Sequence, residues 1–143
     1  MGIELRQRWG AQPVWVRCAL VVYVIGFVEG TRAHVADLLR GGLGAYASYG
    51  PVVLQVFFIS LVVLDPIVVV LVALARPNGV WLGLVVMAMD VPANVFANWS
   101  MLRQDWWSLV RPAGMLPLTL FSVFVLVSVV PLLRHLSASP SAA

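Results

Sequence analysis

Three polar side chains recur every four residues in the apolar stretch 80–99. Asp90, Asn94 and Asn98 therefore fall on one face if this stretch is a helix. At about twenty residues the stretch is long enough to cross a bilayer. An aspartate near the middle of a membrane is costly, so we expect Asp90 to face other helices or a cavity and to be a functional residue.

A second aspartate, Asp65, lies at a similar depth in the preceding apolar run. A carboxylic acid held away from water keeps its proton more readily, and two such acids close together oppose each other's ionisation. A neutral acid in an apolar pocket can protonate an alkene or an epoxide, while an ionised partner stabilises the carbocation or takes a proton back. We therefore expect Asp65 and Asp90 to be catalytic, although each could instead only fix helix packing.

Three further residues have two readings each. Glu29, late in the first apolar segment, could be a third catalytic acid at the pocket mouth or an interfacial ion-pair partner of Arg32. Asn94 and Asn98 could bind the substrate by orienting a hydroxyl group, or they could join neighbouring helices by hydrogen bonds.

The sequence has no metal or cofactor motif. His34 and His135 lack the spacing to carboxylates that a metal site requires, so we expect solvated histidines, no metal and no cofactor. The single cysteine excludes a disulfide within the chain. The net charge of +3 comes from arginines that are scattered over the termini and connections, so we also expect no nucleic-acid binding.

The composition is that of an integral membrane protein. Hydrophobic residues make up 62% of the chain and charged residues only 10%. We predict one transmembrane domain over 1–143, folded as an all-α bundle of four helices. The expected helices span about 14–31, 52–75, 80–99 and 115–133, and the tail 136–143 is expected to be disordered.

The connections set the order of these helices. The turn 76–79 is short and contains proline and glycine, so it predicts an antiparallel hairpin of the second and third helices. The longer stretch 32–51 is expected to be a loop or short surface helix at one end of the bundle. Pro66 and Pro92 remove helical hydrogen bonds close to the two aspartates, so two kinked helices could leave a cavity between them.

Four helices place both termini on one side of the membrane. Five arginines would share that side, against four on the other: Arg6, Arg8, Arg17, Arg76 and Arg134 against Arg32, Arg40, Arg103 and Arg111. The excess of positive charge favours cytoplasmic termini. We expect a multi-pass protein of a bacterial-type cell membrane.

Four short features occur in the order that is typical of one family. Glu29 and Gly30 come late in the first helix, Pro66 lies within the second, Asp90 and Asn94 are one turn apart in the third, and Pro131 comes late in the fourth. This order resembles the EXPERA group, the four-helix membrane proteins typified by the emopamil-binding sterol isomerase and the sigma-2 receptor.

The resemblance implies acidic residues that face a pocket for sterols or lipophilic amines, where the isomerase moves a double bond through a carbocation. This sequence departs from the isomerase pattern in three places. Ile25 stands where the isomerase has a histidine, and Asp65 replaces an acid that would fall near Phe57. The asparagine and tryptophan of the isomerase's last helix have no match among residues 121–130. The resemblance therefore implies an acid-lined pocket rather than sterol isomerisation itself.

These observations favour an isomerase or cyclase that starts its reaction with a proton. Its substrate would be a lipophilic small molecule, sterol-like or terpenoid, held in a pocket between the first three helices. Membrane lipid is the other expected partner. One alternative is a non-catalytic lipid-binding or accessory subunit whose polar stripe recognises another transmembrane helix. A further alternative is proton-coupled transport by a homodimer, because four helices alone enclose too little space for a gated path.

Overall fold

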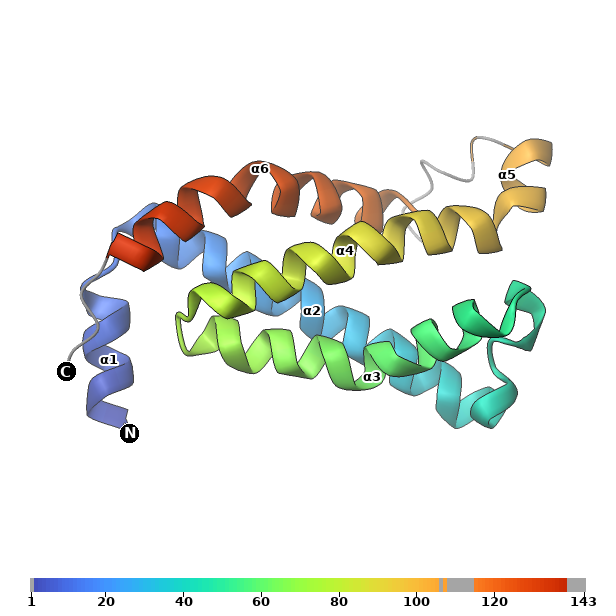
Figure 1. The fold of residues 1–143 in the computed structure, drawn as a ribbon, viewed down its shortest axis with the longest axis horizontal. Coiled ribbons are helices and arrows are strands. Elements are labelled where there is room, and N and C mark those ends of the chain that lie inside the picture. The colour runs from blue at the N-terminus through green and yellow to red at the C-terminus, as the bar shows by residue number, and fades with distance from the viewer. Residues whose placement is uncertain (1, 106, 108–114, 139–143) are drawn as a thin grey trace.

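The computed structural model describes residues 2–105, 107 and 115–138 (Figure 1). These residues form helices and turns, with no strand among them. The helices are α1 (Gly2–Gly10), α2 (Val14–Gly41), α3 (Val52–Ala73), α4 (Pro77–Ala97), α5 (Trp99–Gln104) and α6 (Leu116–Ala138). Two short 3-10 turns, η1 (Gly42–Gly44) and η2 (Ala47–Tyr49), separate α2 from α3.

Helices α2, α3, α4 and α6 are long and apolar enough to cross a membrane. They run alongside one another in Figure 1, with α2 packed on α3, α3 on α4 and α4 on α6. The predicted all-α, multi-pass membrane bundle is thus confirmed. Helix α1 lies across the end of the bundle where α2 begins, and the indole nitrogen of Trp9 donates a hydrogen bond to the carbonyl of Ala73 (2.8 Å).

Helix α2 is ten residues longer than the sequence analysis expected. The prediction of a loop or separate surface helix was wrong for residues 32–41, which continue α2. No glycine or proline occurs between 31 and 40, so nothing there interrupts a helix. Gly42 ends α2 with a positive φ of 58°, which favours glycine, and its N–H bonds the carbonyl of Leu38.

The other boundaries differ by a few residues. Helix α4 begins at Pro77, because proline suits the first position of a helix, and it ends at Ala97. Helix α6 runs to Ala138, so residues 136–138 of the predicted disordered tail are helical. The rest of that tail, 139–143, lies outside the described residues.

The hairpin of α3 and α4 depends on Gly79. A Cβ atom there would lie 2.7 Å from the backbone nitrogen of Val72 and 2.8 Å from the carbonyl carbon of Leu71. Only a glycine permits the two helix ends to approach this closely. The sequence analysis predicted this hairpin, and the packing of α3 on α4 confirms it.

Gly79→Ala is expected to destabilise the bundle by about 1–3 kcal/mol, because rigid backbone atoms must move to make room for the methyl group. Thermal unfolding of the purified protein in detergent measures this change. Gly10→Ala is the matched control, since a Cβ at Gly10 meets nothing within 4 Å. Equal midpoints for both variants would contradict the close approach at Gly79.

Candidate functional site

The carboxyl groups of Asp65 and Asp90 both point into the bundle. Asp65 on α3 is 4% exposed and Asp90 on α4 is 7% exposed, and the two are close enough to interact electrostatically. Their positions follow from the antiparallel hairpin, which sets the inner faces of α3 and α4 against each other. The structure therefore buries both residues that the sequence analysis singled out in the same interior, with Asp65 farther along the bundle than Asp90.

Gly30 gives Asp65 its place against α2. A Cβ atom at Gly30 would lie only 2.6 Å from Oδ2 of Asp65, so any larger residue would displace the carboxyl group. Asp65 forms no hydrogen bond and no ion pair with another described residue. Its carboxyl group is thus buried at the contact between α2 and α3 without a fixed donor or counter-charge.

Asp90, Asn94 and Asn98 form a hydrogen-bonded row along α4. The side-chain amide of Asn94 donates to Oδ1 of Asp90 (2.9 Å) and to the Asp90 carbonyl (3.0 Å). The amide of Asn98, just past the end of α4, donates to the carbonyl of Asn94 (2.9 Å). Asn94 therefore stabilises negative charge on Asp90, while Asn98 is bonded to backbone.

Glu29 does not face the interior. Its side chain is 62% exposed on the outer face of α2, where it accepts hydrogen bonds from the Arg32 guanidinium (Nε to Oε2, 2.8 Å). The expectation that Glu29 lies at the mouth of the pocket is wrong, and the ion-pair reading matches its position. The reason is helical geometry: Glu29 precedes the inward-facing Gly30 by one residue, which turns it about 100° away.

His34, Asp37 and Tyr46 form a polar cluster that the sequence analysis missed. Nδ1 of His34 lies 2.9 Å from the hydroxyl oxygen of Tyr46, and that hydroxyl donates to Oδ2 of Asp37 (3.3 Å). His34 was expected to be a solvated loop histidine, but it is part of α2 and half-buried. That expectation was wrong because α2 extends beyond residue 31.

Aromatic rings hold Tyr46 in place. Its ring stacks on Phe58 of α3 (centroids 5.2 Å apart), and Tyr49 meets both rings edge-on. Burial raises the pKa of Tyr46, and the negative charges of Asp37 and, to a smaller extent, Asp90 raise it further. The Tyr46 hydroxyl therefore stays protonated at neutral pH.

A periodic pattern in the sequence could have revealed half of this cluster. Tyr23, Phe27, Gly30, His34 and Asp37 are spaced by four, three, four and three residues, which is the inward stripe of one continuous helix. Tyr46 has no comparable signal, because its position depends on how the turns η1 and η2 fold back.

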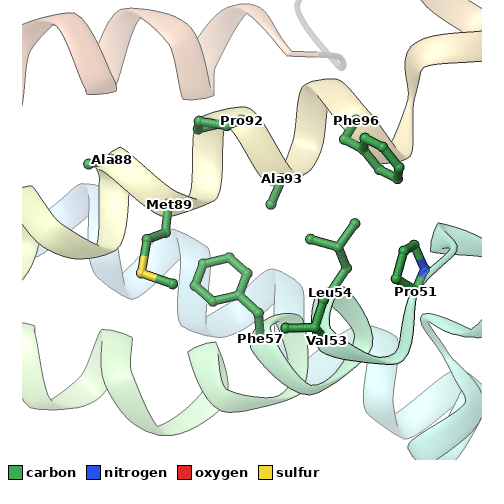
Figure 2. Close-up of a pocket in the computed structure, with 9 residues that line it drawn as sticks. All are labelled: Pro51, Val53, Leu54, Phe57, Ala88, Met89, Pro92, Ala93 and Phe96. Atoms are coloured by element: carbon green, nitrogen blue, oxygen red, sulfur yellow. The ribbon is translucent and has the colours of Figure 1, made fainter.

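An apolar groove lies between α3 and α4 beside this interior (Figure 2). Its volume is about 410 Å³. Its lining is entirely apolar: Pro51, Val53, Leu54, Phe57, Ala88, Met89, Pro92, Ala93 and Phe96. Asp90 lies between Met89 and Pro92 in the chain, but its side chain is buried and does not line the groove.

A second apolar groove, of about 550 Å³, lies between α2 and α3. Neither groove is lined by Asp65 or Asp90. Among the described residues there is also no group of three or more histidine, cysteine or acidic side chains that could hold a metal ion. The arrangement places two carboxyl groups, those of Asp65 and Asp90, in helices whose other faces line apolar grooves.

Comparisons with known proteins identify no relative of this chain. No family model matches the chain, and no curated protein or solved structure is significantly similar to it. The resemblance to the EXPERA group stays a prediction.

Proposed function

We propose that this protein is a membrane-embedded isomerase or cyclase that acts on a terpenoid or sterol-like substrate by protonating it. The observation that carries the proposal is the burial of two carboxyl groups, Asp65 on α3 and Asp90 on α4, in the interior of one bundle. Intramembrane carboxyl groups are costly and are usually functional. No described arginine forms an ion pair with either group, so their protons are not tied to a structural salt bridge.

The environments of the two aspartates suggest different roles. Asn94 donates to Asp90 and favours a negative charge there, whereas no described donor reaches Asp65. In the proposed reaction Asp65 gives its proton to one carbon of an alkene, which leaves a carbocation on the neighbouring carbon. Asp90 stabilises this cation and then removes an adjacent proton, so that a double bond forms at a new position.

The groove between α3 and α4 supplies a route for the substrate. It is apolar throughout, it flanks the segment of α4 that carries Asp90, and in a membrane protein its open side faces lipid. Pro92 lines the groove and has no N–H for the carbonyl of Ala88, so the helix is weakened there. We infer that a hydrocarbon chain lies in this groove and reaches the interior where the segment of α4 around Pro92 is weakened.

The direct test is a search for products of unchanged mass. The purified protein in phospholipid vesicles is incubated with a panel of polyprenyl alcohols, their epoxides and unsaturated sterols, and the extracts are separated by gas chromatography with mass detection. Isomers or rings that empty vesicles do not produce would support the enzyme. Lipids that bind but are recovered unchanged would favour the alternative of a lipid-binding or accessory subunit.

We also propose a bacterial-type cell membrane with both termini in the cytoplasm. Helix α1 and the last turn of α6 lie at the same end of the bundle (Figure 1). Arg8, Arg17 and Arg76 belong to that end as well, and an excess of arginine marks the cytoplasmic side. Cysteine labelling of variants at either end with an impermeant reagent tests the orientation. A homodimer is expected only if the protein is instead a proton-coupled transporter.

A further inference from the structure

Tyr46 is a buried residue in a largely exposed connection. It is 2% exposed, whereas its neighbours Gly44, Ala47 and Ser48 are exposed. Its side chain therefore enters the bundle from the end where α2 and α4 terminate. The hydroxyl bonds with His34 and Asp37 give it both a proton acceptor and a proton donor partner within α2.

The cluster lies at the depth of Asp90. Asp90 is seven residues from the end of α4, which corresponds to about 10 Å along the helix. Phe58, on which Tyr46 stacks, is six residues from the start of α3, about 9 Å from the same end. Tyr46 and Asp90 are also close enough to interact electrostatically, although no direct hydrogen bond joins them.

The other side of the cluster reaches water. The side chain of Asp37 is 41% exposed and lies 3.6 Å from the Arg40 guanidinium, which is more exposed still. Asp37, Tyr46 and His34 are thus joined by hydrogen bonds in a cluster that leads from the surface of the protein to the depth of Asp90. Asp65 lies seven residues beyond Phe58 on α3, deeper than Asp90.

We propose that Tyr46 and His34 form a proton path between water at Asp37 and the carboxyl groups of Asp90 and Asp65. The path rests on the proposed function, which leaves Asp65 without its proton and Asp90 with one after each isomerisation. For the next turnover a proton must leave Asp90 and another must return to Asp65. The Tyr46 hydroxyl can accept a proton from one neighbour while donating its own to the next, and water would carry the proton over the remaining step to Asp90.

The proton path determines how fast the protons of the buried carboxyl groups exchange with deuterium from the solvent. Infrared spectra of the protein in vesicles report the carbonyl stretch of protonated carboxylic acids, and this band shifts when the proton is replaced by deuterium. Asp65→Asn and Asp90→Asn identify the band. After transfer to heavy water we expect Tyr46→Phe to slow the shift by about tenfold or more, since it keeps the ring on Phe58 but removes the hydroxyl.

Tyr49→Phe is the matched control, because Tyr49 packs on the same Phe58 and its hydroxyl lies outside the Tyr46–His34–Asp37 bonds. His34→Gln keeps a polar group beside Tyr46 but cannot accept and release protons, so it should slow the shift as Tyr46→Phe does. Backbone amide exchange, recorded in the same spectra, should be unchanged if the bundle stays closed.

Equal rates in Tyr46→Phe, His34→Gln and the wild type would overturn the path and leave the proposed reaction intact. Absence of any protonated carboxyl band from the wild type would overturn both the path and the acid role of Asp65. A slow shift in Tyr46→Phe, combined with full turnover in Asp90→Asn, would support the path and reject the proposed reaction.

Discussion

Asp90→Asn is expected to lower turnover by about 10²–10⁴-fold, which is the usual contribution of a positioned acid or base. Asparagine has nearly the same shape and can still bond Asn94, but it can neither carry a negative charge nor take a proton from the substrate. The measurement is the rate of product formation in vesicles with the substrate that the lipid panel identifies. Asp65→Asn should cause a loss of the same order, because it removes the proton donor.

Glu29→Gln is the matched control for both variants. It removes a carboxyl group from α2, but one that is exposed and paired with Arg32 outside the bundle. We expect its turnover to equal that of the wild type, and all three variants should unfold at similar temperatures. Full activity in Asp90→Asn, or a loss in Glu29→Gln as large as in Asp90→Asn, would contradict the assignment of the interior pair.

Ala88→Trp is expected to lower kcat/KM by about tenfold or more, equivalent to about 1.4 kcal/mol. Ala88 lines the groove between α3 and α4, and its methyl group is exposed, so a large ring can enter the groove without disturbing the core (Figure 2). The substrate chain would then lose its binding surface. Steady-state kinetics in vesicles measure the loss.

Val127→Trp on α6 controls for the addition of an indole at a lipid-facing position. Val127 is exposed and lies outside the grooves described above. Its kcat/KM should match that of the wild type. If Ala88→Trp were as active as Val127→Trp, the groove would not be the substrate route, and access to the carboxyl groups would have to lie elsewhere.

The architecture could be predicted because it depends on local signals. Apolar runs of membrane-spanning length and the proline and glycine of the turn 76–79 determine the helices and the hairpin. The hairpin in turn brings Asp65 and Asp90 to one interior, because both lie on the inner faces of adjacent antiparallel helices. Because a charged group in lipid is costly, the sequence alone predicts that both aspartates face the interior of the bundle.

The rest of the site depends on where one helix ends. Hydropathy falls after Thr31, so the polar residues 32–41 were assigned to a loop, yet their helix propensity continues α2. That extension places His34 and Asp37 within hydrogen-bonding distance of Tyr46. Tyr46 could not be placed from sequence, because its burial results from a tertiary contact with Phe58 rather than from a local pattern.

The origin of the hydrogen that enters the product tests the central claim most directly. With the reaction run in heavy water, a proton transferred from a solvent-exchanged carboxyl group labels the product with one deuterium at the carbon that was protonated. We predict this label in the product of the wild type and its loss, together with the product, in Asp65→Asn. A product that forms without any deuterium, or that Asp65→Asn forms with the label at the wild-type rate, would contradict protonation by the buried pair.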